Sequence, residues 1–91
     1  MNYEVKHDVE NDLFKIDKEG VTAYLSYSVI GDTINFNSTF TPSELRGKGL
    51  AKLIVEKAFD FALEENLKVT SSCSYVVRFV HQNDEYQKLM K

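Results

Sequence analysis

The stretch from Val21 to Phe40, VTAYLSYSVIGDTINFNSTF, decides the fold. From Val21 to Val29 every second residue is apolar, and the residues between are mostly polar. This is the period of a β-strand with one buried face. Gly31-Asp32 is a two-residue hairpin signal, so Thr33–Phe40 is predicted to return as an antiparallel strand.

The register of this hairpin follows if Ile30 and Thr33 flank the turn. One face then carries apolar residues and the other polar ones, and a slip by one residue would oppose the two sets. The predicted pairs are Val29–Ile34, Tyr27–Phe36, Leu25–Ser38 and Ala23–Phe40 on the apolar face, and Ser28–Asn35 and Ser26–Asn37 on the other. Helices are expected to cover the apolar face, while the second face stays wetter.

Shorter elements surround the hairpin. They are predicted as an edge strand Tyr3–Val9, a strand Leu13–Asp17, an amphipathic helix Leu50–Glu65, a strand Leu67–Ser71 parallel to the Thr33 strand, and a helix Ser74–Gln82. Asp84 is expected to cap a last short helix, with Gln87 completing a capping box. The order predicts an α+β fold. Its mixed, mainly antiparallel sheet has about five strands, a main helix after the fourth strand and two short C-terminal helices.

Length and composition exclude several classes of protein. The 91 residues, 43% hydrophobic and 27% charged, predict one globular domain spanning 1–91. A net charge of −3 lacks the positive field of a nucleic-acid binder. The first ten residues hold no apolar run, so a signal peptide is not expected. No apolar stretch approaches the length of a transmembrane helix, so no membrane partner is expected either. The single cysteine excludes an intramolecular disulfide and favours the cytoplasm.

The segment between the hairpin and the main helix, ELRGKGLAKL at residues 44–53, carries the chemistry. Gly47 and Gly49 allow a sharp turn and close approach of a ligand to the backbone. The first N–H groups of a helix have no internal partner and can hold a phosphate. Arg46, Lys48 and Lys52 add positive charge around that point. The pattern predicts an anion site, although a glycine pair that merely makes a tight connection would read the same.

Two better-known phosphate motifs do not fit this loop. A Walker A loop requires G-x-x-x-x-G-K-[ST], and a dinucleotide fingerprint requires a third glycine. Residues 46–51, RGKGLA, instead match the R/Q-x-x-G-x-G/A signature of the GNAT superfamily of N-acetyltransferases at every fixed position. With Cys73-Ser74-Tyr75 and the terminal segment 84–87, the chain resembles the short, stand-alone members of that superfamily over roughly residues 3–90.

The resemblance implies a fold, a cosubstrate and an activity. The fold would be a minimal GNAT-like fold, and the activity transfer of an acetyl group from acetyl-CoA to an unidentified amine. Backbone amides of the loop would cradle the coenzyme pyrophosphate, and the thioester would lie near the end of the Leu67–Ser72 strand. The implied coenzyme-binding residues are Leu45, Arg46, Gly47, Lys48, Gly49, Leu50, Ala51 and Lys52. Ser38 departs from the family, which usually has a histidine there, and serine is a poor base.

Cys73 and Tyr75 are the candidate catalytic residues. Cys73 follows a strand and would sit at the start of the next helix, where the dipole favours a thiolate. It is expected to accept the acetyl group or to protonate the departing thiolate, unless it is simply a packed small residue. Tyr75 could donate that proton, or be an aromatic core residue, and the same pair of readings applies to Tyr86.

Other titratable residues have weaker claims. His81 is expected to complement a helix C-terminus, His7 to be solvated on an edge strand, and Glu44 to solvate the turn. No ligand spacing for a metal and no Ser/His/Asp arrangement is present. Three functions therefore stay open: direct acetyl transfer to an amine, a non-catalytic CoA- or acyl-CoA-binding module, and an interaction domain whose loop is only a turn.

Overall fold

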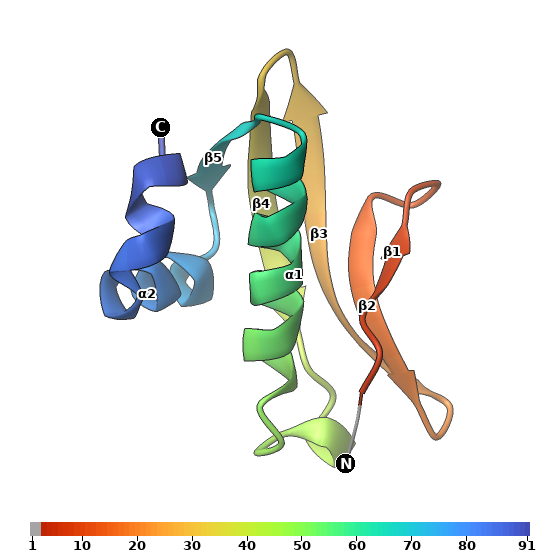
Figure 1. Cartoon of the computed structure of the whole chain (residues 1–91). Coiled ribbons are helices and arrows are strands. Elements are labelled where there is room, and N and C mark those ends of the chain that lie inside the picture. Colours follow the sequence, from red (N-terminus) through yellow and green to blue (C-terminus); the bar gives the residue numbers. More distant parts are fainter. Residues whose placement is uncertain (1–2) are drawn as a thin grey trace.

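A computed structural model describes residues 3–91 of the chain (Figure 1). The first two positions of the predicted 1–91 domain lie outside the described residues. The elements in chain order are β1 (Lys6–Asp8), β2 (Leu13–Lys18), β3 (Val21–Ile30), β4 (Thr33–Phe40), the 3-10 turn η1 (Ser43–Leu45), α1 (Leu50–Glu64), β5 (Lys68–Ser71), α2 (Ser74–Gln82) and the 3-10 helix η2 (Asp84–Leu89).

The five strands form one sheet in the order β1-β2-β3-β4-β5. Neighbouring strands run antiparallel except β4 and β5, which are parallel because α1 carries the chain back across the sheet. Figure 1 shows α1 lying across one face of the sheet, with α2 and η2 beside β5. The predicted α+β architecture, with a main helix after the fourth strand, is confirmed.

The core lies between this sheet and α1. Helical spacing places six buried side chains of α1 on the sheet: Leu50, Ile54, Val55, Ala58, Phe59 and Ala62. Phe59 also stacks on Tyr86, with the ring centroids 4.8 Å apart, and on Phe79, with 6.2 Å. These stacked rings hold α2 and η2 against α1, so the C-terminal segment has a fixed position beside the sheet.

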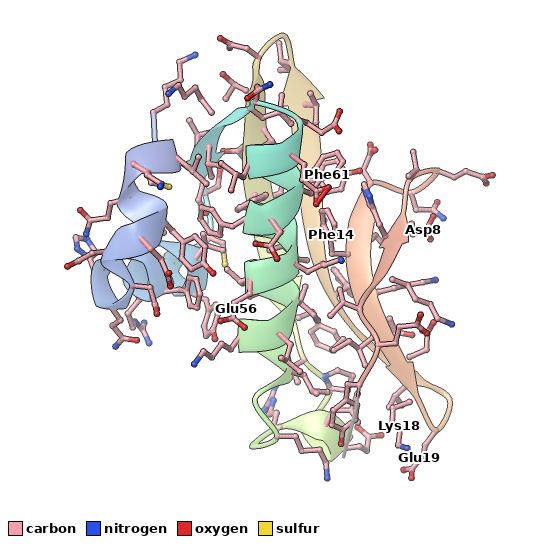
Figure 2. All side chains as sticks on the ribbon, viewed as in Figure 1. Asp8, Phe14, Lys18, Glu19, Glu56 and Phe61 are labelled. Carbon is pink, nitrogen blue, oxygen red and sulfur yellow. The ribbon has the colours of Figure 1, made fainter. Side chains whose placement is uncertain are left out.

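A second aromatic cluster joins β1 and β2 to α1. Figure 2 shows Phe14 and Phe61 side by side, and their ring centroids are 5.7 Å apart. His7 stacks on Phe14 at 4.2 Å, and the His7 Nε2 atom lies 2.6 Å from the hydroxyl of Tyr27. The prediction that His7 is solvated is therefore wrong. An edge strand three residues long places this side chain over the aromatic cluster instead of in water.

The hairpin register is confirmed only up to Phe36. Val29–Ile34, Ser28–Asn35 and Tyr27–Phe36 pair as predicted. Beyond them Asn37 has no partner, and the observed pairs are Ser26–Ser38, Leu25–Thr39 and Tyr24–Phe40. The extra residue is a β-bulge, which shifts all later pairs by one position. The three pairs predicted beyond Phe36, Leu25–Ser38, Ala23–Phe40 and Ser26–Asn37, are wrong for this reason.

Side chains on the uncovered face of the sheet hold this bulge in place. Asn35 Nδ2 donates to Asn37 Oδ1 at 2.6 Å, and Asn37 Nδ2 donates to Ser28 Oγ at 2.9 Å. Thr70 on β5 donates to Asn35 Oδ1 at 2.7 Å. The unpaired residue is therefore tied to strands on both of its sides.

Two details concern the ends of helices. Asn66 follows α1 in the left-handed conformation, with φ of 57°, a common way for a helix to end. The capping box at Asp84 and Gln87 is wrong. Asp84 is the first residue of the 3-10 helix η2, Asn83 is its N-cap, and no side-chain cap bond forms. A 3-10 helix presents its first amides at different positions from an α-helix, so the box spacing does not apply.

Candidate functional site

The loop between β4 and α1 is pinned at both ends and exposed between them. Leu45 and Leu50 are buried, whereas residues 46–49 are exposed. Gly47 and Gly49 adopt φ of 80° and 73°, a region that favours glycine. Two left-handed residues so close together turn the chain sharply into α1, which begins immediately after Gly49.

A run of unpaired backbone amides follows this turn. The amide of Leu45 donates to Pro42 O at 2.9 Å, and that of Arg46 donates to Ser43 O at 3.3 Å. Within residues 3–91, the amides of residues 47–52 form no hydrogen bond of good distance and angle to an acceptor in the chain. The available run therefore begins two residues later than the predicted cradle at Leu45. Its six N–H groups include the positive end of the α1 dipole.

Basic side chains surround these amides. Arg46 Nε donates to the carbonyl of Thr41 at 3.1 Å, which holds the guanidinium at the end of β4. Lys48 and Lys52 are exposed, and neither forms a salt bridge within the described chain. Glu44 accepts a hydrogen bond from the hydroxyl of neighbouring Ser43 at 3.2 Å. The loop thus presents donors and cations, the two groups that bind phosphate.

An unpaired strand edge leads away from this loop. β5 pairs with β4 only as far as Phe36–Ser71, so residues 37–40 of β4 have no partner strand on that side among residues 3–91. The bulge at Asn37 turns Thr39 to the same face as buried Leu25. There Thr39 Oγ1 lies 3.5 Å from Cys73 Sγ, within hydrogen-bonding reach of sulfur. The gap between β4 and α2 therefore brings together a hydroxyl and a thiol.

Cys73 is the N-cap residue of α2 and is half-buried. Its amide donates to Ser71 Oγ at 3.0 Å, and that hydroxyl in turn donates to the carbonyl of Phe36 at 3.1 Å. Burial raises the pKa of the thiol. The Thr39 hydroxyl, 3.5 Å from Sγ, and the nearby backbone N–H groups of Val76, Tyr75 and Thr39 outweigh burial, so the pKa is lowered overall. The site therefore favours the thiolate more than a solvated cysteine would.

Tyr75 is the second residue of α2 and is half-buried against the core. Burial, followed by the negative charges of Glu56 and Cys73, raises the pKa of its phenol. Figure 2 shows Glu56 on the side of α1 that faces α2. Tyr75 therefore keeps its proton at neutral pH and remains a hydrogen-bond donor beside Cys73.

The other candidates lie elsewhere. Tyr86 belongs to the aromatic stack, where burial raises the pKa of its phenol. His81 is exposed in the last turn of α2, and His7 belongs to the cluster with Phe14. Ser38, at the position of the family histidine, faces the uncovered side of the sheet, where its hydroxyl meets that of Ser26 at 3.0 Å. The bulge places Ser38 on the uncovered face and Thr39 on the covered face, the reverse of what unbroken alternation from Phe36 would give.

Two neighbours of Cys73 and Tyr75 were missed from sequence. Thr39 was not among the candidates, because its contact with Cys73 depends on a bulge that alternation does not reveal. Glu56 falls on the polar side of the helical spacing in α1, where acidic residues are usually solvated. It is half-buried, and its charge acts on Tyr75.

Within residues 3–91, no group of three His, Cys, Asp or Glu side chains could hold a metal ion. No described helix combines the length and apolarity needed to cross a membrane.

Comparisons with known proteins agree with this geometry. A sequence model of the GCN5-related N-acetyl-transferase family matches residues 3–89. Protein NATD1 of Danio rerio is 35% identical over 88 residues, covering 93% of this chain and 80% of that protein. Protein NATD1 of Homo sapiens is 34% identical over 82 residues, covering 87% and 73%. The solution structure of a GCN5-like protein from Staphylococcus aureus superimposes with a TM-score of 0.76 at 30% identity, covering 97% of this chain and 87% of that one.

Proposed function

The chain belongs to the GCN5-related N-acetyltransferase family, and we propose that it takes the acetyl group from acetyl-CoA and transfers it directly to an amine. The observation that carries the proposal is the run of unpaired amides at 47–52, which lies next to the unpaired edge of β4. A ligand with a pyrophosphate at one end and an extended arm ending in a thioester suits that combination. The free thiol of Cys73 favours a reducing cytoplasm as the place of action.

The loop supplies the binding energy for the donor. Six N–H groups and the charges of Arg46, Lys48 and Lys52 would hold the pyrophosphate without any rearrangement of the turn. The residues present therefore fit the proposed cosubstrate. Beyond Phe36 the backbone of β4 has no partner on its outer side, so it could pair with an amide-bearing arm of the ligand.

Positioning would supply most of the rate. The nitrogen lone pair of the amine attacks the carbonyl carbon of the thioester, a C–N bond forms, and the C–S bond breaks. Tyr75 gives its phenolic proton to the departing thiolate and regains one from water. The extra proton of the amine nitrogen passes to water. Ser38 takes no part, because its hydroxyl lies on the other face of the sheet.

The environment of Cys73 supports a role close to the thioester. The hydroxyl of Thr39 and the backbone N–H groups of Val76 and Tyr75 lower the pKa of the Cys73 thiol and so favour a negatively charged sulfur there. The same donors would favour the developing thiolate of the leaving group, or the oxyanion of the tetrahedral intermediate. Cys73 is proposed to line this position, while the acetyl group passes to the amine without a covalent enzyme intermediate.

The proposal is tested by binding and turnover together. Acetyl-CoA titrated into ¹⁵N-labelled protein should shift the amide signals of residues 47–52. Release of free CoA thiol, measured with a panel of amines, should exceed the rate without protein. Tyr75→Phe should lower kcat on the order of 10²-fold with donor binding unchanged. Tyr86→Phe, which removes a hydroxyl from the aromatic stack, is the matched control.

The possible results separate the three functions. Amide shifts without turnover of any amine would leave a coenzyme-binding module. The absence of both would end the proposal, since neither donor binding nor transfer would then exist.

A further inference from the structure

A shallow depression at the outer side of α2 adjoins Cys73 and is not used by the chemistry proposed above. It measures about 460 Å³ and lies at the end of β5. Its lining comprises Ser71, Ser72, Cys73, Ser74, Val77, Arg78 and His81. Its volume falls within the usual range for small-molecule sites. Cys73 lies both on its wall and against Thr39, so the depression reaches the position proposed for the thioester.

The depression is lined by basic and neutral residues, whereas the protein as a whole carries a net negative charge. The chain has 14 acidic and 11 basic side chains, yet none of the acidic residues lines this surface. Arg78 is exposed and forms no salt bridge in the described part of the chain. The imidazole of His81 and the hydroxyl of Ser74 likewise have no hydrogen-bond partner among residues 3–91. The start of the α2 dipole adds positive potential on the same side.

These observations define what the surface could hold. Ser74, Arg78 and His81 stand on one face of α2 at intervals of four and three residues. Along the helix axis, Arg78 is about 7.5 Å from Cys73 and His81 about 12 Å, at 1.5 Å per residue. A molecule with an amine at Cys73 and an anionic group a few bonds away would place that group among donors.

We propose that this depression is the acceptor site and that the acceptor is a primary amine carrying a carboxylate or another anionic group, bound through Arg78 and His81. The inference rests on the proposed acetyl transfer and names the substrate class of the same site. The coenzyme also has anionic groups, but its thiol end is the part assigned to Cys73, which leaves its phosphates at the loop.

Binding can be tested without turnover. ¹⁵N-labelled protein saturated with CoA, which has no acetyl group to transfer, is titrated with 4-aminobutyrate and with neutral 4-aminobutyramide. The acid should shift the amides of Ser72 and Ser74 and the Nε–H of Arg78. The neutral compound should bind about tenfold more weakly, the scale of one lost charge-assisted hydrogen bond. Glycine and β-alanine test the spacing between the amine and the anion.

Variants identify the group that binds. Arg78→Gln should abolish the difference between the two compounds. Lys88→Gln removes the same charge from an exposed residue outside the depression and should preserve the difference. In turnover, Arg78→Gln should raise the KM for the acid about tenfold with kcat and the KM for the neutral amine unchanged.

Three results would overturn the inference. Equal shifts from acid and neutral compound would remove the anionic preference, and the absence of shifts from both would remove the site. If CoA or 3′,5′-ADP alone moved the Arg78 signal, the depression would hold the cosubstrate instead. The proposed function fails separately if the amides of residues 47–52 do not respond to CoA. Those signals are distinct from the signals of Ser72, Ser74 and Arg78 that report on the acceptor site.

Discussion

Replacing Gly49 by alanine should abolish the response of the protein to CoA without unfolding it. A Cβ atom at this position meets no heavy atom within 4 Å, so the substitution causes no clash. It projects into the open space beside the unpaired amides. The remaining penalty is the left-handed backbone, with φ of 73°, which costs an alanine about 1–2 kcal/mol. The variant should therefore fold, with a melting temperature lower by very roughly 4–16 °C.

Gly31 provides a matched control at the tip of the hairpin. Its φ is 61°, and a Cβ there also meets no atom within 4 Å. Gly31→Ala should lower the melting temperature of the free protein by a similar amount. Because Gly31 is far from the loop in the sheet, the response to CoA should survive. The pair of variants thus separates backbone strain from loss of the ligand site.

The size of the response can be worked out in advance. CoA at a hundred times its Kd stabilises the protein by about 2.7 kcal/mol. For a chain this small, that is a rise of roughly 11–22 °C in melting temperature. A hundredfold loss of affinity in Gly49→Ala would reduce the stabilisation to about 0.4 kcal/mol, or roughly 2–3 °C. A shift in Gly49→Ala as large as that in Gly31→Ala would refute the assignment of the amides at 47–52 to the pyrophosphate.

Three further predictions concern single side chains. Thr39→Val removes a hydroxyl 3.5 Å from Cys73 Sγ, so the pKa of the thiol should rise and alkylation at neutral pH should slow about 2- to 10-fold, as read from rates across a pH series. Cys73→Ala should retain acetyl transfer within about tenfold, and mass spectrometry of the unsubstituted protein with acetyl-CoA alone should find no acetylated Cys73; a stoichiometric adduct would contradict direct transfer. Burial lowers the pKa of His7 below its usual value, against the opposing charges of two nearby carboxylates. The unfolded chain therefore binds the proton first, so this contribution to stability is complete above about pH 6.5 and is lost as the pH falls below it. Melting curves from pH 7.5 to pH 5 should show this loss in His81→Gln but not in His7→Gln.

Local signals predicted the elements and the loop because each was encoded within a few residues. The alternation from Val21 to Val29 reports a half-buried strand, and the spacing in α1 reports an amphipathic helix. Gly47 and Gly49 mark a turn that other residues adopt only under strain. The coenzyme-binding residues remain a prediction, although the amides of Leu45 and Arg46 are already bonded within the chain.

Features that depend on distant contacts were not predictable in this way. Asn37 looks like an ordinary strand residue, and its bulge depends on Asn35, Ser28 and the end of β5. His7 is polar in sequence, but tertiary packing stacks it on Phe14. The contact between Thr39 and Cys73 spans 34 residues, and it depends on the register shift of β4 at Asn37, two residues before Thr39.

The bulge has a consequence for how the length of β4 determines function. With Asn37 deleted, Phe36 and Ser38 would still oppose Tyr27 and Ser26, and each side chain would keep its present face. Only the bulge would be lost, and the regular strand could then pair along its whole length with an extended β5. Deleting Asn37 alone, with every catalytic candidate retained, is therefore expected to close the unpaired edge of β4. The protein should still fold but should lose acetyl transfer.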